Sequence, residues 1–251
     1  MLRGIYISTT AMMTGRKRMD MVTNNLTNVD TTGYKKDIFV AQSFRDVMLS
    51  RLHDPKITSS VPEIGLLNYG VHIDMIRTDF SQGPLEVTDR RADIALEGDG
   101  FFVVDTPEGE RFTRAGNFYV NMLGFLVNGD GYQVMGENGA IFVENDDFAV
   151  NRSGDISNEA GFIDTLRIVA FEDLETLRKA GHNLYTSTAE PTAADGNGYA
   201  VLQGMLEGSN VDSAREMADM INLYRSYEAN SRILRMADET LGRAMNNIAS
   251  V

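Results

Sequence analysis

The chain contains no cysteine and no tryptophan, and only 5 of its 251 residues are proline. Without cysteine it has no disulfide bond, no thiolate metal ligand and no cysteine nucleophile. It also lacks an apolar run long enough to cross a bilayer. No apolar stretch accompanies the basic residues Arg16, Lys17 and Arg18 in the pattern of a secretory signal peptide. We therefore expect neither a disulfide framework nor insertion into a membrane.

Basic residues are scarce in the middle of the chain. Residues 57–206 contain 9 Lys and Arg against 24 Asp and Glu, whereas residues 1–56 carry a net charge of +4 and residues 207–251 one of −2. An acidic middle region argues against nucleic-acid binding and favours solubility at high concentration. The same charges also fit an ordinary solvated surface.

Signatures of catalysis and of metal binding are missing as well. His53, His72 and His182 lie far apart and lack the spacing of metal ligands. No nucleophile elbow, P-loop or dinucleotide-binding fingerprint occurs. The acidic turns at residues 128–131 and 146–147 miss the pattern of a calcium loop, so turn chemistry explains them better. We predict a protein that is not an enzyme and that holds no metal or cofactor.

The chain does contain a heptad pattern of apolar residues at each end. Near the start, residues 5, 12, 19 and 26 recur every seven positions, interleaved with residues 8, 15, 22 and 29. Near the end, residues 220, 227, 234, 241 and 248 repeat this spacing, interleaved with 217, 224, 231, 238 and 245. This is the spacing of a coiled-coil seam. We predict an assembly seam made of Ile5, Met12, Met19, Val22, Leu26, Met217, Met220, Tyr224, Tyr227, Leu234, Leu241 and Ile248.

Start and stop signals bound the two helices. The first helix is expected from about residue 4 to 28, ending before Gly33, which can adopt the left-handed conformation common at helix ends. The last begins at Asp212 or at the capping box from Ser213 to Glu216, and runs for about 35 residues, or roughly 50 Å. Because both termini should return to one end of the subunit, the helices are expected to be antiparallel.

Short strand patterns bounded by glycine fill the middle of the chain. Asn128 and Gly129 predict a tight hairpin, and residues 38–52 fit either an extended segment or a short helix. The sequence predicts an α+β fold, in which long terminal helices pair as an antiparallel coiled coil around a mostly-β domain. The expected divisions are helix 1–30, extended connector 31–76, β domain 77–190, return segment 191–211 and helix 212–251. Two helices alone bury too little apolar surface to be stable, so the termini are expected to fold on assembly.

Two sequence motifs near the chain ends resemble those of the bacterial flagellar basal-body rod protein family, the rod and hook axial proteins. The first runs from residue 24 to 35 and the second from 206 to 212, continued by residues 216–230; residues 98–104 and 114–118 give a weaker match. The motif positions are Asn24, Asn25, Asn28, Thr32, Gly33, Tyr34, Gly208, Ser209, Asn210, Val211 and Asp212. The three asparagines could bond backbone or neighbouring subunits, or could simply reflect the polarity of a helix end.

The resemblance implies a structural subunit of the flagellar rod, similar to the distal or proximal rod proteins. Such a subunit would polymerise into a helical tube that transmits torque from motor to hook. Its terminal helices would line the tube, and its β domain would face outward. Its partners would be copies of itself, other rod and hook proteins, and the flagellar type III export apparatus, in the basal body outside the cytoplasmic membrane.

An alternative is an adapter module of the flagellar axis whose β domain contacts a ring, a cap or a cell-wall partner. A glycan-cleaving enzyme is a third class, but the sequence offers no persuasive pair of catalytic acids and no extra domain for it.

Overall fold

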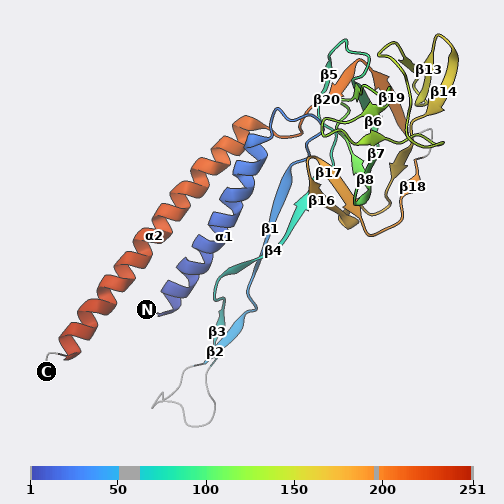
Figure 1. The fold of residues 1–251 in the computed structure, drawn as a ribbon. Coiled ribbons are helices and arrows are strands. Elements are labelled where there is room, and N and C mark those ends of the chain that lie inside the picture. Colours follow the sequence, from blue (N-terminus) through green and yellow to red (C-terminus); the bar gives the residue numbers. More distant parts are fainter. Residues whose placement is uncertain (1, 51–62, 195–197, 250–251) are drawn as a thin grey trace. The chain divides into compact units, whose positions relative to one another are not determined.

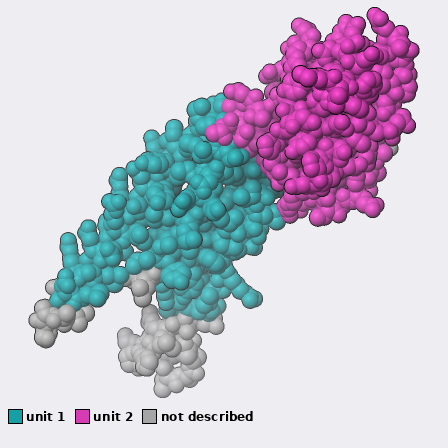
Figure 2. Space-filling view, in the orientation of Figure 1, with its two compact units in different colours: residues 1–26, 37–77, 213–251 teal, residues 27–36, 78–212 magenta. Residues whose placement is uncertain are grey.

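The computed structural model describes residues 2–50, 63–194 and 198–249. The chain divides into two units, coloured separately in Figure 2. Unit 1 comprises residues 1–26, 37–77 and 213–251, and unit 2 comprises residues 27–36 and 78–212. The chain therefore begins and ends in unit 1 and forms unit 2 from its middle.

Two long helices dominate unit 1. Helix α1 spans Leu2–Thr27 and helix α2 spans Ser213–Ala249. They lie side by side and run in opposite directions, so that the N- and C-terminal ends lie at the same end of unit 1 (Figure 1). After α1 the chain turns at Asn28, whose carbonyl accepts the Thr31 N–H at 3.2 Å, and reaches Gly33 with a φ of 66°. The predicted α+β fold with paired terminal helices is confirmed.

The segment between residues 37 and 78 forms two narrow ladders in place of a helix. Strand β1 (Asp37–Ser43) pairs with β4 (Val71–Thr78), and β2 (Val47–Ser50) pairs antiparallel with β3 (Glu63–Leu67). The short helix left open for residues 38–52 is therefore wrong as far as Ser50, and residues 51–62 lie outside the described part. β-Branched and aromatic residues such as Ile38, Phe39 and Val40 favour the extended backbone that is found.

Unit 2 is built almost entirely of short strands. A nine-stranded sheet has the order β16-β17-β8-β7-β11-β10-β9, with β15 on β7 and β18 on β15. Smaller sheets pair β19 with β6, β20 with β5, and β12, β13 and β14 with one another. A single 3-10 helical turn, Leu174–Thr176, completes the described elements. The strands are β5 Leu85–Val87, β6 Ile94–Gly98, β7 Phe101–Thr106, β8 Gly109–Thr113, β9 Tyr119–Val120, β10 Leu126–Val127, β11 Gln133–Val134, β12 Ala149–Val150, β13 Asp155–Asn158, β14 Gly161–Thr165, β15 Ile168–Ala170, β16 Leu177–Gly181, β17 Leu184–Ser187, β18 Thr192–Ala193, β19 Tyr199–Gln203 and β20 Met205–Glu207.

Strand β7 lies at the centre of the packing because both of its faces are buried. Side chains alternate between the faces of a strand. Phe102 and Val104 accordingly belong to the larger apolar cluster, and Phe101 and Val103 to the smaller one. A run of four buried apolar residues, which no alternating pattern would give, thus marks the strand that holds the two clusters together.

Two further segments, the loop at Asn128 and strand β19, can be compared with the predictions made from the sequence. The hairpin predicted at Asn128 exists between β10 and β11, where Val127 pairs with Gln133, but its loop is longer than a two-residue turn. The Asn128 side chain accepts the N–H groups of Asp130 at 3.1 Å and Tyr132 at 2.9 Å, which stabilises the wider loop. Strand β19, from the expected return segment, pairs along its whole length with β6 and contributes Val201 to the larger cluster.

Candidate functional site

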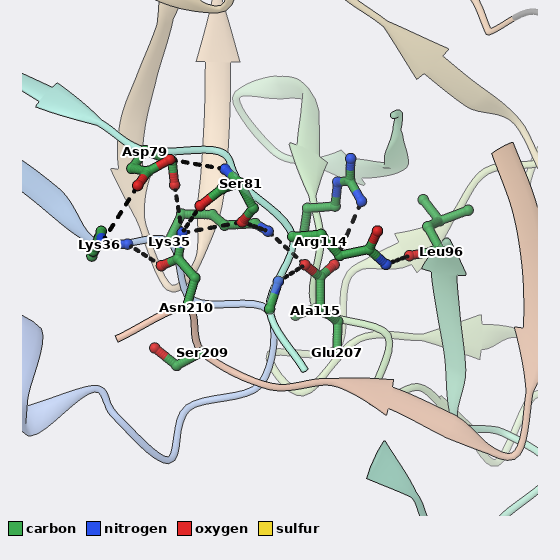
Figure 3. Close-up of polar contacts among 12 residues, drawn as sticks. Lys35, Lys36, Asp79, Ser81, Leu96, Arg114, Ala115, Glu207, Ser209 and Asn210 are labelled. Atoms are coloured by element: carbon green, nitrogen blue, oxygen red, sulfur yellow. Dashed lines mark hydrogen bonds and ion pairs between the residues drawn. The ribbon is translucent and has the colours of Figure 1, made fainter. Parts of the chain in front are cut away.

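The two terminal motifs meet inside unit 2 around one buried carboxylate. Glu207, at the end of β20, has a side chain that is 0% exposed, as is that of Lys35. The Lys35 ammonium lies 2.5 Å from Glu207 Oε1, and Arg114 Nη1 lies 3.5 Å from Glu207 Oε2 (Figure 3). The Gly83 N–H donates to Glu207 Oε1 at 2.9 Å. We call the contacts of residues 32–36 and 207–210 with their surroundings the motif junction.

Backbone carbonyls hold the two cations of the junction in place. Lys35 Nζ donates to the Ser81 carbonyl at 2.8 Å, and Arg114 Nη2 donates to the Gly98 carbonyl at 2.8 Å. The Arg114 guanidinium also lies over the Phe101 ring, 5.2 Å from its centroid. The hydrogen-bonded neighbours are needed because a buried charge without partners is strongly destabilising.

Two cations, Lys35 and Arg114, share the Glu207 carboxylate, and burial lowers the pKa of both. Desolvation lowers the pKa of Lys35 below its ordinary value of 10.5, although Glu207 opposes the shift, and the nearby Arg114 adds to it. Burial likewise lowers the pKa of Arg114, again against the attraction of Glu207. Both cations of the junction are held by the Glu207 carboxylate and by backbone carbonyls, so the arrangement connects separate parts of unit 2.

Asn210 joins the two motifs through its side-chain amide. Its Oδ1 accepts the Lys36 N–H at 2.8 Å, and its Nδ2 donates to the carbonyls of Asp79 at 2.9 Å and Ser81 at 3.1 Å (Figure 3). The Asn210 N–H also donates to the Tyr34 carbonyl at 3.4 Å. An amide offers both donors and acceptors, which lets one side chain bridge three backbone segments.

Gly33 allows the chain to pass close to the β domain. Its φ of 66° is in the left-handed region, and a Cβ atom at this position would lie 2.4 Å from the backbone nitrogen of Ala115. Its N–H donates to the Glu207 carbonyl at 2.7 Å. Only glycine combines this conformation with this approach, which explains its place in the motif.

The hairpin of β16 and β17 also contacts the N-terminal motif. Lys179 Nζ donates to the Lys35 carbonyl at 2.8 Å and lies 4.4 Å from the centroid of the Tyr34 ring. At the tip of the hairpin, Asn183 Nδ2 donates to the Thr32 carbonyl at 2.9 Å. Tyr34 is consequently buried.

The remaining motif positions have varied surroundings. In unit 1, Asn25 is 0% exposed and exchanges two hydrogen bonds of 3.0 Å with the backbone of Asp37, whereas Asn24 is exposed. In unit 2, the Asn28 Oδ1 accepts the Thr31 hydroxyl at 3.2 Å. The backbone-bonding role left open for the asparagines thus describes Asn25.

The other residues of the second motif lie around Asn210. The Gly208 N–H donates to the Pro84 carbonyl at 2.8 Å. Ser209 and Val211 are buried, and Asp212 is exposed.

The predicted seam residues fall into two groups in unit 1. Val22 is buried, and Ile5, Met12, Met19 and Leu26 of α1 are partly buried, as are Met220, Tyr227, Leu234 and Leu241 of α2. Met217 and Tyr224, by contrast, are 50% and 56% exposed. The second partly buried row of α2 lies one position earlier than expected, at residues 216, 223, 230, 237 and 244. The side chain of Ile248 lies outside the described part.

Sequence reasoning missed the three charged residues at the centre of the junction. Lys35, Arg114 and Glu207 all lie within stretches that carry the family resemblance, but none of the three was among the predicted site residues. No local pattern pairs Lys35 with Glu207, since 172 positions separate them.

Within residues 2–50, 63–194 and 198–249, no cluster of three or more His, Asp or Glu side chains is arranged to hold a metal ion. None of the described helices is long and apolar enough to cross a membrane.

Comparison with known proteins matches three parts of the chain to flagellar families. Residues 5–35 match the flagella basal body rod protein family, residues 95–163 the D1 domain of flagellar hook proteins FlgE/F/G, and residues 202–248 the C-terminal region of flagellar basal body rod FlgEFG proteins. The first of these matches contains residues 32–35 of the motif junction, and the last contains residues 207–210.

Similar proteins cover the chain from end to end. It is 32% identical to the flagellar hook-basal body complex protein FlhO of Bacillus subtilis, over 100% of both chains. It is 33% identical to the flagellar basal-body rod protein FlgG of the same organism, over 98% of this chain and 99% of the relative. With the rod protein FlgF of Caulobacter vibrioides it shares 30% identity over 94% of this chain and 92% of the relative. The chain therefore belongs to the flagellar basal-body rod protein family, as a structural, non-enzymatic subunit of the rod similar to FlgG and FlgF.

Proposed function

We propose that this subunit polymerises with copies of itself and with other rod and hook proteins into a helical tube that carries torque from motor to hook. The observation that supports this is the exposed apolar surface on both helices of unit 1. On α1 and α2 the exposed large apolar side chains are Tyr6, Ile7, Met13, Met217, Ile221, Tyr224, Ile233, Met236 and Met245.

Helices with apolar residues on more than one side need more than one partner. The partly buried row containing Tyr227 and Leu234 packs inside unit 1, while Met217 and Tyr224 remain exposed. Full burial of such a side chain stabilises by roughly 1.5–3 kcal/mol. Neighbouring subunits that covered these faces would supply stability that one chain cannot give itself, and Met217 and Tyr224 of the predicted seam would then be assembly contacts.

The motif junction gives unit 2 a defined role in this proposal. Torque applied to a tube acts on every subunit. A subunit transmits this torque well when its segments cannot move relative to one another. Unit 2 contains the segment that follows α1, residues 27–36, and the segment that precedes α2, residues 207–212. The junction joins these two segments to each other and to the β domain. Their spacing is thereby fixed by hydrogen bonds and by buried charge.

The proposal includes passage through the flagellar type III export apparatus in an unfolded state. The chain has no cysteine, so no disulfide has to form or break on the way. Apolar side chains exposed on isolated helices also favour a terminus that orders late, once neighbours are present.

Leu234→Asp tests the assembly role of the helices. Leu234 is partly buried on the inward row of α2, so a carboxylate there should prevent incorporation into basal bodies while unit 2 stays folded. Asn222→Asp is the matched control, because Asn222 is exposed on α2 and should tolerate the change. Incorporation is measured by immunoblot of isolated basal bodies, and folding by the thermal transition of the purified chain. Motile cells carrying only the Leu234→Asp chain would contradict the proposal.

One observation favours an additional contact made by the β domain. Met122 is 106% exposed and Leu123 73% exposed, in a turn held by the Asn121 side chain, which accepts the N–H groups of Leu123 at 3.0 Å and Phe125 at 2.9 Å. A rigid turn that presents apolar side chains to water suits contact with a ring, cap or cell-wall partner. Replacing both residues by serine should leave rod incorporation intact and weaken motility if such a contact exists.

A further inference from the structure

Unit 1 contains an apolar groove of about 600 Å³ beside α1. Its apolar lining includes Met13 of α1, together with Phe44, Val71 and Ile73 from the paired strands and their connections, and Arg16 and Lys17 add positive charge. We call it the α1 groove. With Asp20 also present, the charged lining has a net positive charge.

A complementary surface lies on α2. Met217, Ile221 and Tyr224 are 50%, 53% and 56% exposed, and their spacing of four and three residues places them on one face of the helix. Glu228, four positions further along the same face, is also exposed. Glu228 lies 4.0 Å from Arg232, one turn further along α2, in a pair whose side chains are 47% and 77% exposed. The α2 stripe is thus an apolar strip with an exposed carboxylate at one end.

The α2 stripe does not fill the α1 groove of its own chain. Among the described residues, those that line the groove come from α1 and from the segment between residues 44 and 73, and none comes from α2. The α2 residues that face α1, β1 and β4 across a second hollow include Leu223, Tyr227 and Asn230, on a different side of the helix. An occupant of the groove with the chemistry of the stripe must come from another copy.

We propose that the α2 stripe of one subunit docks into the α1 groove of the next. The apolar side chains enter the groove, and Glu228 meets the positive charge of Arg16 and Lys17. Stripe and groove are different surfaces, so each subunit that docks leaves one of each free. Such a heterologous contact continues into an open helical assembly. The inference rests on the proposed polymerisation and names its contact surfaces.

Cross-linking in assembled flagella tests this contact, because the natural chain has no cysteine. One chain carries Met13→Cys and a second, tagged to differ in size, carries Tyr224→Cys; both are expressed in one cell. Basal bodies are isolated and treated with a short bis-maleimide reagent. The mixed-size dimer should form. The matched control replaces Tyr224→Cys by Asn222→Cys, an exposed position on another side of α2, and should give no mixed dimer.

The possible results separate the contact from the proposed function. If both chains are present in basal bodies and the Tyr224→Cys pair gives no more mixed dimer than the control, the contact is wrong and polymerisation stands. If the cysteine-free chain is absent from basal bodies, both proposals are wrong.

Charge reversal gives a second test that does not depend on cysteine. Glu228→Lys and Lys17→Glu, each made alone in the cross-linking pair, should cause loss of the mixed dimer through like-charge repulsion. Made together, they should restore it. Equal yields in all of these chains would overturn the assigned charge contact and with it the docking orientation.

Discussion

The two units of this subunit differ most in where their apolar side chains are buried. Among the described residues, Val22 is the only buried apolar side chain of unit 1, while both buried clusters lie wholly within unit 2. Unit 2 therefore resembles an ordinary folded domain with its own core. Unit 1 resembles half of an interface, since its helices present apolar faces that one chain leaves uncovered.

Charge separates the units in the same way. Unit 2 contains 10 basic and 25 acidic residues, a net charge of −15, whereas unit 1 contains 13 basic and 11 acidic residues, a net charge of +2. Like-charged surfaces repel one another, so close packing between copies is easier through unit 1. Burial and charge thus indicate the same division, in which unit 2 provides stability and unit 1 provides contacts.

The largest effect should come from opening a cavity in unit 2. Phe102 is fully buried and packs edge-to-face on Phe118, with ring centroids 5.2 Å apart. Phe102→Ala should lower the free energy of unfolding by about 3–5 kcal/mol, measured by urea denaturation of the purified chain. Met19→Ala, on the partly buried row of α1, should cost about 1 kcal/mol or less. Similar losses for both would remove the distinction between the units.

The motif junction should be nearly as sensitive as the core. Lys35→Met leaves Glu207 with one cation fewer in a buried site and should cost about 3 kcal/mol. Lys36→Met is the matched control: its ammonium lies 3.6 Å from Asp79 in a pair that is partly exposed, and such pairs are worth about 1 kcal/mol or less.

A double-mutant cycle then measures the coupling within the junction. Lys35→Met combined with Glu207→Gln should cost clearly less than the sum of the two single changes, because neither buried charge is left alone. Strict additivity would show that the two residues do not stabilise unit 2 as a pair.

A smaller effect is expected from pH. Burial lowers the pKa of Lys35 from 10.5, so between the lowered value and 10.5 the unfolded chain binds more protons at this residue than the folded chain. The Lys35 contribution to the free energy of unfolding should therefore rise with pH across that window. Urea titrations at alkaline pH should show a rise for the natural chain relative to Lys35→Met. A fall instead would mean that Glu207 raises the Lys35 pKa more than burial lowers it.

Local patterns were enough to predict the helices and the presence of a β domain. Heptad spacing placed α1 and α2 correctly, because burial of one face imposes a period on the sequence. The same pattern missed the second partly buried row of α2 by one position, since Met217 and Tyr224 are as apolar as Met220 and Tyr227. Apolar spacing shows that a residue needs a partner, but it does not show whether that partner is in the same chain.

Local sequence patterns could not predict the contacts of the motif junction, and the reason is a different one. The resemblance identified Gly33 and Asn210 as motif residues, but their partners, Glu207, Ala115 and the Lys36 N–H, come from other parts of the chain. Lys35 and Glu207 were not singled out because a buried ion pair has no local signature. The sheet order in unit 2 is also set by contacts between distant strands.

Native-state hydrogen exchange on the dilute, full-length monomer tests the contrast between the units most directly, because it reports the opening free energy of each segment. Strands β6, β7 and β19 of unit 2 should exchange only through global unfolding. Helices α1 and α2 should exchange many times faster and gain protection when subunits assemble. Helices protected as strongly as β7 in the isolated monomer would contradict the view that unit 1 depends on its neighbours.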